Sequence, residues 1–319
     1  MKLKASLFSL IGTFLTIIAP TISLAQGLSC GPDSLSMFSV QPKVFIGYMF
    51  PNRPTTLSID TSGSGFQIQS LEQSFNVQGL WMELVVPIRC PSPLGFAMGL
   101  GYLFPANYRS RETYNITGGG VAERTWSTST QMVNFQVAAT YRFSPSVTGI
   151  LGFRYDSFMT NYLEPENLLQ NPLTFYGNQR ADLTISGDIP FAGAMVERTF
   201  LNAANLKAGA IGLPTLPGQI EYREAVQTSS DGRGAILSRE FRSGYFLEGF
   251  AELSIPISRW GQMGAFAKYN GVYGRATKAN VSGGKTSDGK GGTVDMTIEA
   301  NVTFDRSSWM FGGTISAGF

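Results

Sequence analysis

Apolar side chains recur at every second position in many short segments of this chain. The pattern is most regular in the last eleven residues, where Trp309, Phe311, Ile315 and Phe319 share one face with two small residues. The opposite face, which begins at Met310, carries small and mostly polar side chains. A period of two is typical of a β-strand, because successive side chains point to opposite sides of the sheet. This segment is therefore predicted to be a strand with one apolar and one polar face.

Segments with this alternation follow one another from residue 43 to the end of the chain. Short turns and long polar connections alternate between them. A polar loop is predicted at 55–65, and the long connections are predicted at 105–130, 161–187, 217–243 and 276–292. The predicted strands are 43–50, 78–88, 95–104, 133–143, 151–156, 188–199, 206–216, 245–257, 262–273, 293–304 and 309–319.

The terminal segment resembles the C-terminal strand of bacterial outer-membrane β-barrels, which ends in an aromatic residue, usually Phe, after alternating apolar positions. In those proteins the barrel-assembly machinery recognises this strand. Strands of ~9–11 residues cross a bilayer when tilted, and short periplasmic turns with long extracellular loops are typical of such barrels. The resemblance implies an all-β, transmembrane antiparallel barrel in the bacterial outer membrane. Its implied partners are outer-membrane lipid and the assembly machinery.

The strand count leaves the direction of the last strand open. Eleven strands are recognisable in the sequence, whereas bacterial barrels of one chain normally have an even number. We expect about twelve strands, with ten as the alternative. The weak alternation at 188–216 and the stretch at 30–43 are the places where a strand can be missed or merged.

The first residues have the three parts of a secretory signal peptide. Lys2 and Lys4 precede an apolar run at 7–19, and small residues at 23–25 form a cleavage site. We therefore expect a signal peptide at 1–25, a periplasmic N-terminal segment at 26–42 and the barrel at 43–319. No later segment approaches the ~18 consecutive apolar residues of a membrane-spanning helix.

Charge and cysteine content add two expectations. The chain has 24 lysines and arginines and 22 acids, and cleavage after residue 25 removes Lys2 and Lys4, which leaves equal numbers. A neutral balance gives no indication of a nucleic-acid partner. In an exported protein, Cys30 and Cys90 are expected to form a disulfide, with two separate thiols as the alternative.

The chain contains no histidine. This excludes Ser-His and Cys-His nucleophile pairs and histidine-based zinc sites. Glu248 and Glu252 lie four residues apart on a predicted strand, or ~13 Å, which is too far for a carboxylate dyad. We therefore expect no enzymatic activity, no cofactor and no metal site.

Charged residues on the predicted inward faces are the candidate functional residues. A charge inside a barrel needs water or a partner, so these residues either line a wet pore or pair into a network that closes the lumen. Inward Trp81, Phe246, Phe250 and Phe266 indicate that part of the interior is narrowed. The candidate lumen-lining residues are Glu83, Arg142, Arg154, Asp156, Glu248, Glu252, Lys268, Asp295 and Glu299.

The pattern of polar-in strands favours a porin-like channel for small hydrophilic solutes. The alternative is a structural or surface-interaction barrel, adhesin-like, with a plugged lumen and binding loops. A carrier of hydrophobic molecules is a third hypothesis, based on the inward aromatic residues. The sequence does not indicate an oligomeric state.

Overall fold

A computed structural model describes residues 39–61, 68–89, 93–116, 120–165, 180–200, 204–214, 218–225, 236–241, 243–258, 261–287 and 293–317. Within these ranges no helix is both long and apolar enough to cross a membrane. The predicted signal peptide, Cys30, Cys90 and Phe319 lie outside the described residues.

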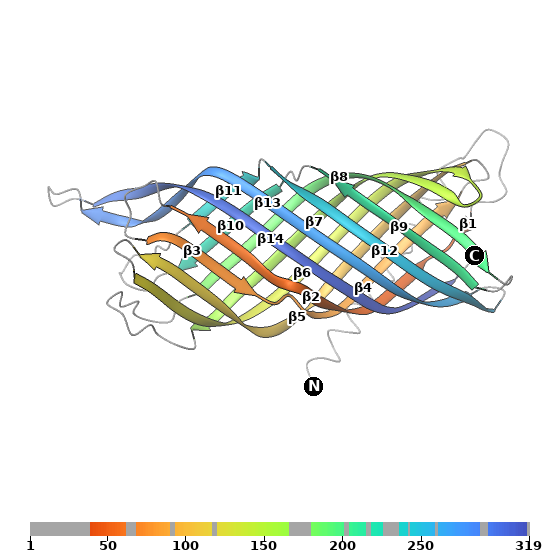
Figure 1. The fold of residues 1–319 in the computed structure, drawn as a ribbon, viewed down its shortest axis with the longest axis horizontal. Helices are drawn as coiled ribbons and strands as arrows, with labels where there is room; N and C mark the ends of the chain where they lie inside the picture. The colour runs from red at the N-terminus through yellow and green to blue at the C-terminus, as the bar shows by residue number, and fades with distance from the viewer. Residues whose placement is uncertain are drawn as a thin grey trace.

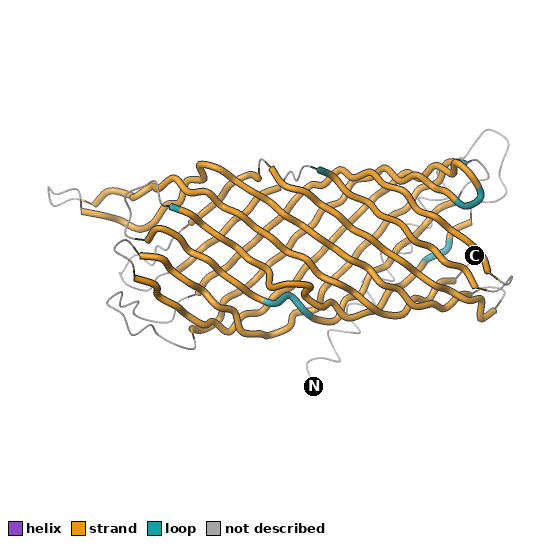
Figure 2. The backbone as a smooth tube through the Cα atoms, viewed as in Figure 1, coloured by secondary structure: helices purple, strands orange, loops and turns teal. Residues whose placement is uncertain are grey.

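The described chain forms one antiparallel sheet of fourteen strand segments (Figures 1 and 2). Its segments are β1 (Ser39–Val40), β2 (Lys43–Asp60), β3 (Ile68–Phe75), β4 (Gly79–Arg89), β5 (Leu94–Ile116), β6 (Gly120–Ser144), β7 (Val147–Pro165), β8 (Arg180–Phe200), β9 (Ala204–Leu213), β10 (Gly218–Ala225), β11 (Ile236–Phe241), β12 (Ser243–Ser258), β13 (Gly261–Ser287) and β14 (Thr293–Ala317).

The segments combine into a closed ring of ten barrel strands. β3 and β4 together form one strand of the wall, because both pair with β2 on one side and with β5 on the other. β9 and β10 likewise form one strand, since both pair with β8, and β11 and β12 form another, since both pair with β13. β1 pairs with β4 in the same register as β2. β14 pairs with β2 from Ser316↔Lys43 to Asn301↔Asp60, which closes the ring. The prediction of an antiparallel barrel is confirmed, with ten strands rather than twelve.

The odd number of strands recognised in the sequence has one cause: a single strand was predicted as two. The predicted strands 293–304 and 309–319 are a single strand, β14, and the predicted turn at 305–308 lies within it. With ten strands, both ends of the barrel chain lie at the same rim, where the backbone N–H of Ala317 donates to the carbonyl oxygen of Pro42. The short turns lie at this rim too, so it is the periplasmic one. The last strand therefore runs toward the periplasm.

Much of the polar sequence predicted as long loops is strand. β5 ends at Ile116 and β6 begins at Gly120. The connection predicted at 105–130 is therefore limited to residues 117–119. The other intervals between strands at the opposite, extracellular rim are 61–67, 166–179, 226–235 and 288–292. The barrel wall is therefore much taller than a bilayer requires (Figure 1).

The periplasmic half of the wall has an apolar outer face. On β6 the outward residues from Val133 to Phe143 are apolar, a span of eleven residues, which suits a bilayer crossing. Aromatic rings lie where this apolar band meets the extracellular part of the wall. The ring centres of Tyr269 and Trp309 are 5.1 Å apart, and those of Tyr245 and Tyr273 are 5.8 Å apart. Outward side chains more than a third exposed include Ile46, Phe50, Phe96, Phe135, Val137, Leu151, Phe153, Leu253, Ile255, Phe311 and Ile315.

The extracellular half has the opposite distribution of polarity. Val302 and Phe304 of β14 point inward and are buried, whereas Glu299 and Asn301 are exposed on the outer face. The same faces of β14 remain inward and outward along the strand, but the apolar residues change from the outer face to the inner face. The prediction that Glu299 lines the lumen is therefore wrong. It assumed that apolar residues always face lipid, and beyond the membrane the outer face is in contact with water. The backbone of Asp295 pairs with Lys285, and its side chain lies outside the described part.

Irregularities of the wall cluster at the level where the polarity changes. On β2, Pro51 and Pro54 lie at a register shift opposite β14. Residues 76–78 interrupt the neighbouring strand between β3 and β4. A bulge between Leu103 and Ala106, next to Pro105, changes which side chains of β5 face inward. Proline lacks the N–H for a ladder hydrogen bond, so bulges are where a strand accommodates it. These prolines therefore did not end the strands.

Two glycines let the first and last strands close the ring. Gly47 and Gly312 are paired across β2 and β14, and both face inward. A Cβ on Gly312 would overlap the backbone oxygen of Ile46 and the Cα of Gly47, and a Cβ on Gly47 would lie 2.8 Å from the Phe266 ring. The Phe266 side chain thus packs over the seam where a larger residue has no space.

We expect Gly312→Val to destabilise the barrel by about 1–3 kcal/mol or more, because overpacking at a backbone contact displaces the closing strand. The measurement is urea unfolding in detergent, with the heat-modifiable band on gels reporting the folded fraction. Gly313→Val is the matched control, since a Cβ there meets only the Gly264 oxygen at 3.6 Å. Equal stability of the two variants would contradict this account of the seam.

The reversal of polarity predicts which residues are accessible on intact cells. In a background with Cys30 and Cys90 replaced by serine, Glu299→Cys should react with a membrane-impermeant maleimide, because Glu299 is exposed on the extracellular wall. Val302→Cys should not react in the folded protein, because Val302 is fully buried. Labelling of Val302→Cys with Glu299→Cys unlabelled would show that the faces are assigned the wrong way round.

Candidate functional site: the lumen cavity and its ion network

The periplasmic half of the lumen contains a cavity of about 660 Å³. Its lining begins at Pro145 and Ser146, in the turn between β6 and β7, and ends at Glu83, Glu248 and Lys268 deep in the barrel. The cavity is therefore open toward the periplasmic rim and bounded at its inner end by charged residues. Its size is within the range of ~300–1,000 Å³ found for pockets that bind small molecules.

The inner end of the cavity is an ion network that crosses the lumen. Lys268 Nζ lies 2.7 Å from Glu83 Oε2 and 3.4 Å from Glu248 Oε1. Arg154 Nη1 lies 2.6 Å from Glu248 Oε2, and its Nε lies 2.5 Å from Asp156 Oδ1. All five residues are less than a tenth exposed. The charges are paired at short distances, as burial requires.

Two of the ion pairs, Arg154–Glu248 and Lys268–Glu83, join strands that are not neighbours in the wall. Arg154 is on β7 and Glu248 on β12, with β8 and β9 between them. Lys268 on β13 reaches Glu83 on β4 past β14 and β2, where the inward residues include the glycine pair of the seam. The network therefore braces opposite sides of the barrel.

Neutral side chains donate further hydrogen bonds to Glu83 and Glu248. Trp81 Nε1 donates to Glu83 Oε2 at 3.3 Å, and Gln136 Nε2 donates to Glu83 Oε1 at 3.3 Å. Asn270 Nδ2 donates to Glu248 Oε2 at 3.4 Å. These hydrogen bonds satisfy acceptor positions that the ion pairs leave free, which lowers the cost of burying the carboxylates.

Arg306 adds a third buried cation above the network. Its Nη2 donates to Asn270 Oδ1 at 2.6 Å, and its guanidinium lies 5.6 Å from the centre of the Phe158 ring. With Arg306 included, three cations face three carboxylates: Arg154, Lys268 and Arg306 against Glu83, Asp156 and Glu248. The inner end of the cavity is thus electrically neutral.

A second ion pair lies closer to the periplasmic rim. Lys43 Nζ donates to both carboxylate oxygens of Glu252, at 2.7 and 2.9 Å, and Thr314 Oγ1 donates to Glu252 Oε1 at 3.1 Å. Near the rim, Lys207 Nζ lies 3.5 Å from Glu197 Oε1. Arg142 also lines the cavity, and its side chain is exposed.

Aromatic and aliphatic side chains form the walls between these charged groups. Phe45 packs edge-on against Phe266 with ring centres 5.2 Å apart, and Phe191 and Phe250 also line the cavity. The Nζ atoms of Lys43 and Lys268 each lie 5.8 Å from the centre of the Phe45 ring. The site is therefore a chamber lined by both aromatic and polar side chains, with ion pairs at its inner end and nearer its rim.

Polar groups in the extracellular half of the lumen bond to one another. Glu112 accepts hydrogen bonds from Gln73 Nε2 at 2.9 Å and from Trp126 Nε1 at 2.7 Å. The Tyr108 hydroxyl contacts Thr130 Oγ1, and burial raises the pKa of Tyr108 well above its ordinary value. These groups support the packing of the core, and they do not form an open polar surface.

The structure brings together six of the nine candidate lumen residues in the two ion clusters: Glu83, Arg154, Asp156, Glu248, Glu252 and Lys268. Arg142 lies at the rim, and Glu299 is on the outer wall. Lys43 and Arg306 were missed. Lys43 is two residues before Phe45 and four before Gly47, both inward, so the alternation of the strand could have identified it as an inward residue. Arg306 was missed because it lay in a predicted turn. Within the described residues, no cluster of three acidic, cysteine or histidine side chains could hold a metal ion.

Comparisons with known proteins place the fold among outer-membrane barrels. No family model matches the chain, and no curated protein sequence matches it. The structure resembles the outer membrane protease OmpT from Escherichia coli with a TM-score of 0.66 and 8% sequence identity, over 90% of this chain and 99% of that chain. A weaker match is the translocator domain of the autotransporter NalP from Neisseria meningitidis, with a TM-score of 0.36 and 11% identity, over 97% of this chain and 96% of that one. The protein is an outer-membrane β-barrel, and at these identities the matches show the fold alone.

Lys268 is expected to be the cation on which the network depends. We expect Lys268→Met to lower the unfolding free energy by about 3–5 kcal/mol, because Glu83 loses its cation and Glu248 keeps only Arg154. Urea unfolding in detergent micelles, followed by tryptophan fluorescence, measures the change.

The double variant Lys268→Met/Glu83→Gln provides the control, because it restores charge balance. It should recover much of the lost stability. A double variant as unstable as the single one would show that the two charges are not coupled.

Proposed function

We propose that the protein is a closed, non-conducting outer-membrane barrel whose extracellular half is a rigid platform for surface interactions. The observation that carries this proposal is the hydrophobic core that fills the extracellular half of the lumen. The proposal corresponds to the surface-interaction alternative of the sequence analysis and replaces the porin-like channel as the preferred function.

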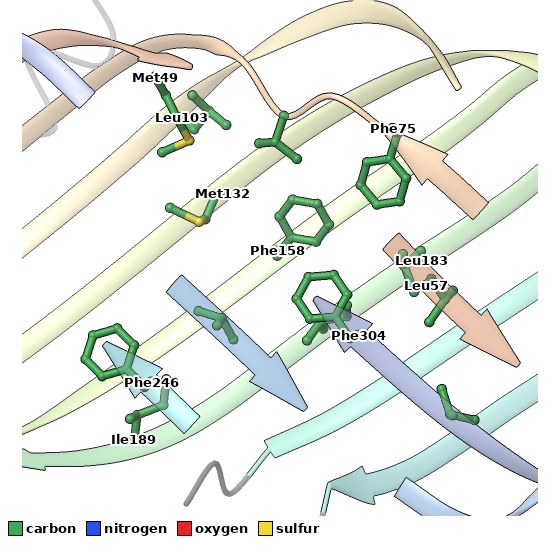
Figure 3. Close-up of a cluster of buried hydrophobic side chains, with 14 of the residues drawn as sticks. Met49, Leu57, Phe75, Leu103, Met132, Phe158, Leu183, Ile189, Phe246 and Phe304 are labelled. Carbon is green, nitrogen blue, oxygen red and sulfur yellow. The ribbon is translucent and has the colours of Figure 1, made fainter. Parts of the chain in front are cut away.

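Aromatic side chains from different parts of the wall meet inside the lumen, where Phe75, Phe158 and Phe304 lie close together (Figure 3). The Phe158 ring of β7 lies 6.0 Å from Phe75 of β3 and 5.8 Å from Phe304 of β14. A solute passing through the lumen would have to displace these rings. Other buried members of this core are Leu57, Ile59, Leu71, Trp126, Met132, Leu183, Ile185, Val272, Ala276, Ala300 and Val302.

The ion network forms a second barrier below the core. Its side chains span the lumen and are paired at 2.5–3.4 Å. Breaking a buried pair costs about 3–5 kcal/mol, and a cavity on its extracellular side, beside Arg306 and Phe304, has a volume of about 30 Å³. A hydrophilic solute therefore meets paired charges first and an apolar core next, neither of which resembles a wet pore.

The extracellular half has the features of a water-exposed support. β6 continues from the apolar band at Val133 to Gly120, which adds ~40 Å of strand. Its outward residues there include Thr125, Ser127 and Ser129, and Arg111 on β5 pairs with Glu123. A packed core inside and a polar surface outside make this half rigid and soluble. It holds the extracellular rim well away from the lipid.

The proposal includes no catalytic role. The chain has no histidine, and the carboxylates that line the lumen cavity and its ion network are engaged with cations. The similarity in fold to a protease gives no reason to assign protease activity, because the identity is 8%.

Conductance in planar lipid bilayers tests the closed lumen. Folded wild-type protein should give no discrete steps in 1 M KCl, and liposomes that contain it should not swell in sugar solutions. Regular conductance steps from the folded protein would overturn the proposal in favour of a porin-like channel.

The triple variant Phe158→Ala/Arg154→Ala/Glu248→Ala is the positive control for the assay. It removes one ring of the core and one brace of the network, and the heat-modifiable gel band verifies that it folds. Where it folds, we expect it to leak ions, while the wild type remains silent.

A further inference from the structure

The lumen cavity has an apolar body, and its excess positive charge lies at its periplasmic opening. Among the charged residues that line it, Lys43 is paired with Glu252, Lys268 with Glu83 and Glu248, and Lys207 with Glu197. These pairs leave two lining cations, Arg142 and Arg198. Both lie near the periplasmic rim: Arg142 is two residues before the end of β6, and Arg198 is two residues before the end of β8.

Arg142 is the rim cation best placed to contact a ligand. It occupies an inward position at the end of β6, opposite Thr148 of β7, and no carboxylate in the described ranges forms an ion pair with it. Arg198, by contrast, lies 5.6 Å from the Phe200 ring. A guanidinium presents two parallel N–H donors, which match the oxygens of a carboxylate, phosphate or sulfonate.

The interior of the cavity suits the apolar part of the same molecule. Phe45, Phe191, Phe250 and Phe266 line it, together with Ile150 and Ala138. Burying an alkyl chain against these side chains is favourable, because it removes apolar surface from water. The ion pairs at the inner end satisfy one another, so they do not require a charged group from the ligand.

The geometry points to this cavity as a periplasm-facing binding site for an amphipathic anion, with the acidic head at Arg142 and the apolar chain among the phenylalanines. The ligand enters and leaves by the periplasmic rim, because the ion network and the core close the other end. This site is additional to the proposed surface role and does not depend on it. The conductance test can contradict the closed lumen while the binding test supports the cavity site, and the reverse is equally possible.

Binding is measured on full-length protein in lipid nanodiscs with 11-(dansylamino)undecanoate as the probe. Trp81 donates to Glu83 at the inner end of the cavity, so tryptophan-sensitised dansyl emission reports occupancy. We expect saturable emission that dodecanoate competes away and dodecyltrimethylammonium, which has the same chain and a positive head, does not. Non-saturable emission equal to that of protein-free nanodiscs would overturn the proposal.

Two neighbouring alanines provide matched variants for the location of the site. Ala138 lines the cavity, whereas Ala139 is on the outward face of the same strand. Ala138→Trp should abolish saturable binding, and Ala139→Trp should leave it unchanged, with the heat-modifiable gel band verifying that both fold. Equal binding by the two variants would place the probe in the surrounding lipid and contradict the site.

Arg142→Gln tests the role of the acidic head. It should weaken dodecanoate competition about tenfold and leave competition by dodecanol unchanged, and Arg142→Lys should recover part of the affinity. An equal effect on the acid and the alcohol would contradict anion recognition.

Nanodiscs with and without phosphatidylglycerol distinguish the source of the anion. Loss of probe binding in the anionic nanodiscs indicates a lipid headgroup, and unchanged binding indicates a free acid from the periplasm.

Discussion

The change of solvent along the barrel wall determines the rest of the structure. Every backbone group in a membrane must be paired within the protein, which requires a closed ring of strands. Around the periplasmic half the ring is in contact with lipid, and around the extracellular half with water. The outer face must therefore change from apolar to polar at one level of the wall. Because side chains alternate, the inner face changes in the opposite sense, from charged residues to a hydrophobic core.

The ion network lies at the junction of these two interiors. Below it, inward positions can carry charge because they are shielded from lipid by the wall. Above it, the lumen is filled by Phe75, Phe158 and Phe304, as in a soluble protein. The charges are tolerated because three cations face three carboxylates, and because Trp81, Gln136 and Asn270 donate further hydrogen bonds to Glu83 and Glu248. Buried charges of this kind brace the barrel only as a complete set.

This arrangement divides the lumen into two parts with different possibilities. The extracellular part is filled by the hydrophobic core, and in the proposed function it supports a rim far from the membrane. The periplasmic part retains a cavity of about 660 Å³ that is open at one end. In barrels of about eight strands the interior is filled by side chains or holds one small ligand. In this barrel side chains fill the extracellular part, and the periplasmic part retains space for a small molecule.

The sequence by itself determined the barrel, its membrane and the identity of the inner charges below the junction. The alternation in 78–88, 151–156, 245–257 and 262–273 placed Glu83, Arg154, Glu248 and Lys268 on the polar face, and the polar face of a lipid-exposed strand can only be the inner one. It could not show where the wall leaves the membrane. Within β14 the apolar residues change phase between Phe304 and Trp309, and in sequence this is indistinguishable from a turn between two strands. Only the tertiary structure decided that the strand continues, because pairing with β2 and β13 on both sides holds it straight through the change. The ring closure likewise decided which charges meet, since Arg154 and Glu248 are 94 residues apart and lie on strands that do not pair.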